Sequence, residues 1–533
     1  MASNQVHTPR GETGPPVHCV MPPAPELEEK IRAAKKLVAA GRDLSEQNGD
    51  GLGWREFNLI TSRPARTRPD TFGEVRREAA PVLGTRRAIV LLVDFSDAPA
   101  TRTQAHFQDL LFSSGTSANG SMRDFFREAS YGKLDVTGQV AGAGGPTAGW
   151  FRAPRPKSFY TDGNYGFGSH PKNAQGLVED VLQLADGHVD FSTFDNDGDG
   201  TVEALVVVCA GSGAEQTGNV GDLWSHKWGI SPQTRDGKKI STYFMAPEDG
   251  RVGVMAHELG HLLMGWPDLY DTDYSSAGTG AWDLMAGGSW NGGGDRPAHP
   301  TAWCKARAGW ITPTVVWNAS RSVTIAPYAR QATAYKLPVG SAASTEYFLV
   351  SNRQQTGFDS DIPGEGLLIE HVDDTQQANS DENHYLVDIE QADGRRDLNL
   401  NANRGDATDV YPTGSNAAFT DATTPSSKSY AGAASKVSVE NIARSGDDVT
   451  ADLSVGGAAA RGWVHHRTVR ATFAHATSQW AWADLEGVGW RRVQGGSADA
   501  VTNMFVGLCE AMANQRPVHA DVDGSLIYTM YVV

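Results

Sequence analysis

Two histidines one helical turn apart, with a glutamate between them, carry the clearest chemistry in this sequence. Residues 253–264 read GVMAHELGHLLM, so His257 and His261 stand at i and i+4 in an apolar-periodic helix. That spacing puts both imidazoles on one face, where they can share a metal ion. Glu258 is too close in sequence to be the third ligand and is placed to take a proton from an activated water. We predict a catalytic zinc, in preference to a chance HExxH on a surface helix.

The residues after this helix could complete such a site. Gly265-Trp266-Pro267-Asp268 ends the helix, and the turn could bring Asp268 back toward the histidines. Further on, residues 282–288 read WDLMAGG and place Met285 in a tight turn. A Met-turn of this kind forms the hydrophobic floor under the metal in the metzincin class.

At these residues the sequence resembles the immune inhibitor A family of secreted bacterial zinc metalloproteases. The resemblance covers roughly residues 85–455 and implies a zincin-type fold, protein or peptide substrates, secretion, and a third zinc ligand from the Asp of HExxHxxGxxD, here Asp268. The segments that carry it are HELGHLLMGWPDLYD, GAWDLMAGGSWNGGG and HPTAWCKARAGW, with SMRDFFREASYGKLDVTG and DFSTFDNDGDGTVEALVVV upstream, and EYFLVSNRQQTGFD and GEGLLIEHVDD downstream.

One inserted residue separates this chain from the family motif. The motif places Gly seven and Asp ten positions after the first His, whereas Gly265 and Asp268 stand at eight and eleven, so Met264 is an insertion. One extra residue rotates the exit of a helix by ~100°. A π-bulge or a longer last turn would absorb this rotation. We therefore keep Asp268 as the predicted ligand, with Asp271 and Asp273 as the alternatives.

An acidic loop indicates a second cation. Residues 195–200 read DNDGDG, which repeats oxygen ligands at alternate positions and has Gly at the sixth, as in the first half of an EF-hand loop. Position 12 falls inside a strand, so Glu203 would have to complete the set with Asp195, Asp197 and Asp199. We predict a structural calcium site, and an Asx-rich turn is the alternative. A second acidic stretch at residues 393–409 could also bind calcium, but it is more typical of solvated hairpin loops.

Four further residues could act at the metal site. Cys19, in VHCVMPP, could place a thiolate on the open zinc position and keep a zymogen silent, or it could be an unpaired surface thiol. His226 could line the cleft or steady an oxyanion, and a structural histidine is an equal alternative. Tyr270 and Tyr274 are candidates for an oxyanion donor.

Composition excludes several classes of protein. The 533 residues carry 63 acidic and 46 basic side chains, a net charge of −17, which argues against nucleic acid or an anionic membrane as the main partner. No apolar run approaches the ~18–20 residues of a transmembrane helix. The first residues lack the basic and apolar regions of a signal peptide. The family resemblance predicts secretion, and a cytoplasmic protein is the alternative.

The pattern along the chain predicts a multidomain α+β protein. Residues 1–80 read as a partly helical leader or pro-segment without an obvious core, and 81–311 as a zincin-type catalytic domain. Short alternating segments at 312–456 predict an all-β, sandwich-like domain, and 462–533 a small α+β module. The predicted function is a zinc-dependent endopeptidase. The rival is a degenerate zincin that acts as a binding or adhesion protein, which the Met264 insertion favours.

Overall fold

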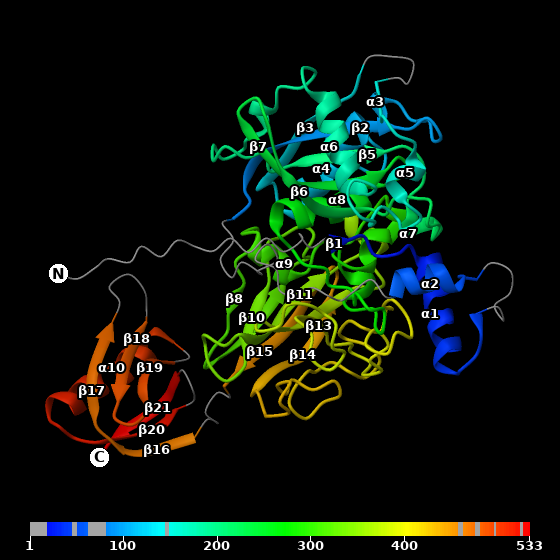
Figure 1. Cartoon of the computed structure of the whole chain (residues 1–533). Helices are drawn as coiled ribbons and strands as arrows, with labels where there is room; N and C mark the ends of the chain where they lie inside the picture. The colour runs from blue at the N-terminus through cyan, green and yellow to red at the C-terminus, as the bar shows by residue number, and fades with distance from the viewer. Residues whose placement is uncertain are drawn as a thin grey trace, which may run out of the picture.

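The computed structural model describes most of the chain. Residues 1–18 of the predicted leader and residues 457–461, between the predicted β-domain and the last module, lie outside the described residues. The described ranges are 19–44, 51–61, 81–143, 149–456, 462–474, 480–494, 497–522 and 526–533. They form a mixed α/β protein with four sheets (Figure 1). Among them, no helix is both long and apolar enough to cross a bilayer.

The largest sheet has seven strands and supports the predicted metal site. Its order is β1-β6-β7-β5-β2-β3, and β4 also pairs with β2. The pairs β2–β3, β2–β5 and β5–β7 are parallel, which explains why β2 and β5 read as continuous apolar runs. The strands are β1 (Cys19–Val20), β2 (Gly84–Asp94), β3 (Leu134–Ala141), β4 (Phe151–Arg152), β5 (Leu205–Cys209), β6 (His226–Arg235) and β7 (Lys238–Pro247).

The helices α3, α4, α6 and α9 of this region begin at side-chain caps. The Ser121 side chain accepts a hydrogen bond from the Asp124 N–H, and the Asp124 carboxylate accepts one from the Ser121 N–H. Together they form a capping box that starts α4. Asn173 caps α6 through the Gly176 N–H. The helices are α3 (Gln104–Phe112), α4 (Met122–Ala129), α5 (Lys157–Thr161), α6 (Ala174–Ala185), α7 (Ala214–Thr217), α8 (Val252–Leu259) and α9 (Ala302–Arg307).

The N-terminal helices belong to the main core, contrary to the expectation of a leader without one. Helix α1 (Pro25–Ala39) buries Leu27, Ile31 and Ala34, and α2 (Trp54–Thr61) buries Phe57 and Ile60. These side chains join the same apolar cluster as the central sheet. The spacing of Leu27, Ile31 and Ala34 follows one helix face, so the signal for this packing was present in the sequence.

Residues 314–455 contain two further sheets around a shared apolar core. Phe348 and Ile369 on one sheet and Val439 and Leu453 on the other belong to one buried cluster. The five-stranded sheet has the order β13-β12-β11-β10-β8, and the three-stranded sheet β14-β15-β9. Their strands are β8 (Thr314–Val315), β9 (Ala319–Ile325), β10 (Tyr335–Pro338), β11 (Glu346–Arg353), β12 (Gly366–Asp373), β13 (Val387–Ile389), β14 (Val437–Ser445) and β15 (Asp448–Val455).

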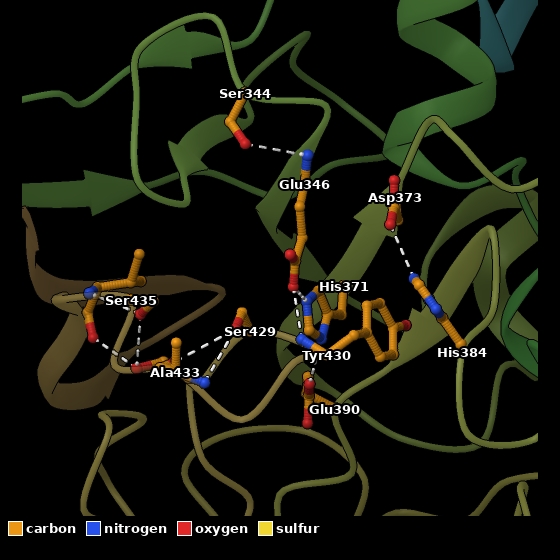
Figure 2. A network of polar contacts seen from close by, with 12 residues as sticks. Ser344, Glu346, His371, Asp373, His384, Glu390, Ser429, Tyr430, Ala433 and Ser435 are labelled. Carbon is orange, nitrogen blue, oxygen red and sulfur yellow. Dashed lines mark hydrogen bonds and ion pairs between the residues drawn. The ribbon is translucent and has the colours of Figure 1, made fainter.

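A polar network surrounds His371 in this region (Figure 2). Its Nε2 lies 3.0 Å from Glu346 and its Nδ1 lies 3.0 Å from Glu390. The Tyr430 ring stacks on the imidazole at 4.0 Å between centroids, and His384 lies against the same tyrosine. The two carboxylates outweigh the burial that disfavours a charged imidazole, and they raise the pKa of His371 to about 9.

The last module is a six-stranded sheet with one helix on it. The order is β16-β20-β21-β19-β18-β17, and α10 (Ala498–Ala513) packs on β17, β18 and β21. Its apolar cluster is separate from the others. The strands, orange to red in Figure 1, are β16 (Gly462–Arg467), β17 (Val469–Ala474), β18 (Ala481–Leu485), β19 (Gly489–Val493), β20 (Val518–Val522) and β21 (Leu526–Val532).

Candidate metal centre

The helix with the two histidines ends in a π turn. All residues of α8 are buried, and the chain continues as a π-helix at Gly260–Met264. Gly265 then adopts φ 65°, a left-handed conformation that glycine adopts without strain, and it ends the helix. A π turn holds one residue more than an α turn. The extra residue at Met264 is therefore accommodated without displacing the segment from Gly265 to Asp268.

Three donor atoms converge beside this turn. His261 Nε2 lies 3.0 Å from His257 Nε2 and 3.0 Å from an oxygen of Asp268, and His257 Nε2 lies 3.2 Å from the same oxygen. Tetrahedral ligands at ~2.05 Å from a zinc ion stand about 3.3 Å apart. The chain thus brings two imidazole nitrogens and a carboxylate oxygen to the separations that one metal ion requires.

Backbone carbonyls fix the orientation of both imidazoles. His257 Nδ1 lies 2.9 Å from Leu284 O, and His261 Nδ1 lies 2.6 Å from Trp266 O. Because a carbonyl only accepts, Nδ1 carries the proton and Nε2 keeps its lone pair toward the other donors. Burial lowers the pKa of His257, whereas at His261 the nearby Cys19 and Asp268 outweigh burial and raise the pKa. Metal binding at these two imidazoles is therefore accompanied by loss of the His261 proton.

The aspartate beside the two histidines is Asp268. The two alternative ligands, Asp271 and Asp273, form contacts away from the histidines. The carboxylate of Asp271 accepts hydrogen bonds from Ser275 and Ser276 in a local turn. Asp273 forms an ion pair with Lys35. Burial opposes ionisation of Asp268, but the adjacent His261 and His257 outweigh it and lower the pKa of that carboxyl.

Glu258 is buried beside the three donors without a partner. Both of its carboxylate oxygens lack a hydrogen bond to any described protein atom. Burial raises the pKa of Glu258 well above its ordinary value. A buried carboxylate left unpaired is costly unless a ligand or water satisfies it. This orphaned group fits a site that holds a metal ion and its water.

The predicted Met-turn lies directly under the histidine helix. Met285 is fully buried, and its N-terminal neighbour Leu284 supplies the carbonyl that His257 contacts. A Cβ added to Gly260 would stand 2.9 Å from Met285 Sδ, so glycine is required for this close approach. Arg353 from β11 donates to Trp282 O at 2.9 Å and holds the turn from the neighbouring sheet. Nothing in the local sequence indicates that long-range contact.

The structure also places the remaining predicted residues. The Cys19 sulfur, a His261 nitrogen and an Asp268 oxygen all lie within 4.8 Å of one another. Tyr270 donates to Val20 O at 2.8 Å, and Tyr274 stacks on Tyr270. His226 instead lies between Trp224 O and the Tyr243 hydroxyl, a buried structural position.

The acidic loop gathers its four carboxylates. Asp195, Asp197, Asp199 and Glu203 each offer an oxygen within 4.8 Å of the others. Lys238 lies 2.7 Å from Asp195 and compensates part of this charge. A second group, Asp393, Asp397 and Asp406, is equally close together, in the stretch where the sequence favours solvated loops.

The β6–β7 hairpin was not predicted, although it borders the site. Its turn is Asp236-Gly237, with φ 48° and 75°, between the paired residues Arg235 and Lys238. An Asp-Gly pair between strands is a strong two-residue hairpin signal. The polar segment SPQTR before this turn lacks the apolar–polar alternation by which a strand is recognised in sequence.

The comparisons with known proteins match the part of the chain that contains this site. Residues 82–315 match the family model described as immune inhibitor A peptidase M6, catalytic domain. The chain is 31% identical over 277 residues to the pre-pro-metalloprotease PrtV of Vibrio cholerae serotype O1, covering 42% of this chain and 29% of that protein. It is 31% identical over 273 residues to immune inhibitor A of Bacillus thuringiensis subsp. alesti, covering 41% of this chain and 37% of that protein.

This chain therefore spans well under half the length of the curated relatives it matches. The match lies on the segment that contains the histidine helix, the π turn and the Met-turn. The resemblance to the immune inhibitor A family is confirmed over this catalytic segment, residues 82–315.

Proposed function

We propose that this chain is a zinc-dependent endopeptidase. The observation that carries the proposal is the convergence of His257, His261 and Asp268 beside the unpaired carboxylate of Glu258. Two neutral imidazoles and one carboxylate are typical of a catalytic zinc site with an open position. The relative from Vibrio cholerae, a metalloprotease, supports the same reaction class.

His257, His261 and Asp268 would hold the zinc. When bound, zinc supplies Lewis acidity that polarises a scissile carbonyl and acidifies water. Glu258 accepts the proton of the attacking water and donates it to the leaving amine. Its buried carboxylate, beside the donors and without a hydrogen-bond partner among the described residues, suits a group that passes this proton between the two steps.

The pairing on strand β6 is the evidence that the substrate is an internal stretch of polypeptide. The short strand β1 pairs antiparallel with β6 and presents Cys19, an internal residue, toward the metal donors. A substrate chain can add to the same strand by backbone hydrogen bonds, with little dependence on its sequence. An endopeptidase needs an edge strand of this kind, along which an internal segment of a substrate can pair.

The remaining parts receive the roles expected from the sequence. Residues 81–311 form the catalytic domain, 312–456 a β-sandwich-like domain and 462–533 a small module, and residues 1–80 are a leader or pro-segment. Asp195, Asp197, Asp199 and Glu203 bind a structural calcium ion. The family resemblance supports a secreted protein. Against the rival of a degenerate binding protein, the π turn accommodates the Met264 insertion that was its main support.

Metal removal and return test the proposal. We expect the purified chain to contain about one zinc ion. Phenanthroline should abolish cleavage of an unstructured protein such as gelatin, and added zinc should restore it. Cleavage that continues after complete zinc removal would contradict the proposal. Assays should include the Cys19→Ser variant, because the Cys19 sulfur lies close enough to His261 and Asp268 to occupy the site.

A further inference from the structure

A short N-terminal strap, which we define as Cys19–Ala24, lies along the edge strand beside the metal donors. Its first two residues form β1, in which Cys19 pairs with Lys227 and Val20 with His226 of β6. The residues Met21–Ala24 are buried. In Figure 1 the strap begins at the strand labelled β1 and runs, in dark blue, to α1.

The strap is held through its backbone, as a bound peptide would be. Tyr270 donates to Val20 O at 2.8 Å, Trp224 to Met21 O at 2.7 Å, and Trp290 to Pro22 O at 3.0 Å. Two strap N–H groups donate in turn, Met21 to Ser225 O at 3.0 Å and Ala24 to Glu215 O at 2.7 Å. Three successive carbonyls of the strap therefore accept hydrogen bonds from side chains that belong to separate segments of the catalytic region.

The chain after the strap is fixed as well. Glu28 of α1 forms an ion pair with Arg404 at 3.0 Å, and Arg32 donates to Asn401 at 2.9 Å. Leu27 and Ile31 of the same helix enter the main core. Helix α1 thus clamps the strap at its C-terminal end and leaves Cys19 at the metal donors.

The Cys19 thiol has no other role in the described structure. All four cysteines are described, and none forms a disulfide. Cys19 Sγ shares the space of the site with His261 and Asp268, within 4.8 Å of both donor atoms. Beside it, the buried Glu258 carboxylate has no hydrogen-bond partner among the described residues. A thiolate is a strong zinc ligand, with a bond of ~2.3 Å.

We propose that Cys19 is the fourth protein ligand of the metal, so that the strap holds the intact chain in a latent state. The inference rests on the proposed zinc site. Three protein ligands leave one position for water, and a sulfur in that position excludes the water from which Glu258 would take a proton. The strap also covers the β6 edge on which a substrate chain would pair. Activation then requires that the sulfur leave the metal or that the strap be removed.

Cobalt substitution tests this assignment without relying on activity. Co(II) at the site gives visible d–d bands from any ligand set, and a thiolate ligand adds a sulfur-to-cobalt charge-transfer band in the near ultraviolet. We expect both in the wild type. Cys19→Ser should keep the d–d bands and lose the charge-transfer band. Cys509→Ser, a second cysteine that is not fully buried, is the matched control and should keep both.

A second measurement covers the case in which Cys19→Ser disturbs the fold. In the intact zinc form Cys19 should react slowly with a thiol reagent, and phenanthroline should accelerate the reaction. Trp290→Phe removes the hydrogen bond to Pro22 O and should accelerate it with zinc in place.

The outcomes separate this inference from the proposed function. Visible d–d bands without a charge-transfer band in the wild type, or a charge-transfer band that persists in Cys19→Ser, would overturn the role of Cys19 and leave the metal site standing. A wild-type chain that binds no cobalt would overturn the metal site, and this inference with it.

Discussion

His257 Nδ1 lies 2.9 Å from the carbonyl oxygen of Leu284, the residue before Met285. This contact joins the histidine helix to the Met-turn, segments that are 27 residues apart. It fixes the tautomer of His257 and so directs the lone pair of Nε2 toward His261 and Asp268. The geometry of the site therefore depends on the path of the turn as well as on the helix.

The first prediction concerns the packing of Gly260 on that turn. In a helix, alanine is normally more favourable than glycine by about 1 kcal/mol of folding free energy. Here the added Cβ would stand 2.9 Å from Met285 Sδ and 3.0 Å from a Trp266 ring carbon. We expect Gly260→Ala to destabilise the chain by about 1–3 kcal/mol and to weaken zinc binding. Urea unfolding measures this change. A gain in stability would contradict the prediction, because it would mean that the Met-turn shifts to accommodate the added Cβ.

The second prediction separates Asp268 from Asp271. Loss of a residue that only orients a ligand lowers metal affinity by about 10–100-fold, and loss of a ligand should exceed that. We expect Asp268→Asn to lose more than about 100-fold in zinc affinity, measured by chelator competition. Asp271→Asn is the matched control, because its carboxylate accepts from Ser275 and Ser276, and it should keep zinc. The reverse result would assign the ligand to Asp271.

The third prediction is a pH-dependent contribution from His371. Its pKa is about 9 in the fold, above the ordinary 6.5, so the protonated form stabilises the folded state. The contribution, on the order of 3 kcal/mol, is complete below about pH 6.5 and is lost as the pH rises through about 9. We expect urea unfolding to show this decline in the wild type and not in His371→Gln. His384→Gln, at the edge of the same network, should retain it.

The fourth prediction concerns calcium at the acidic loop. A cation that binds only the folded chain raises its apparent stability by mass action. We expect calcium to raise the melting temperature of the wild type, and Asp197→Asn to reduce this increase. Asp393→Asn, in the second acidic group, is the control and should respond as the wild type does. An identical calcium response in Asp197→Asn would indicate that this loop is only a turn.

Local patterns predicted much of the helix and strand content. The apolar periodicity of residues 253–264 corresponds to α8 and the π turn after it, and the short alternating segments at 312–456 correspond to the strands β8 to β15. The Met264 insertion indicated an irregular helix end, and the structure has a π turn there. Each of these features is set by neighbours in sequence.

Contacts between distant segments could not be read in the same way. The contact to Leu284 is made by its backbone carbonyl, which is independent of the residue type. The hydrogen bond from Arg353 to Trp282 O joins residues 71 positions apart. The position of Cys19 depends on Trp224 and Trp290, whose indoles donate to the strap backbone from separate segments. Such contacts follow from the tertiary arrangement, which no local periodicity encodes.

The substitution Glu258→Gln tests the central claim most directly. It removes the proton acceptor and leaves His257, His261 and Asp268 in place. It is best made in the Cys19→Ser background, where the strap cannot supply a ligand, with Cys19→Ser alone as the control. The account predicts an unchanged zinc content, about one ion per chain, and a fall in kcat/KM on an unstructured protein of at least about 10²–10⁴-fold. Cleavage at the control rate with zinc bound would contradict it.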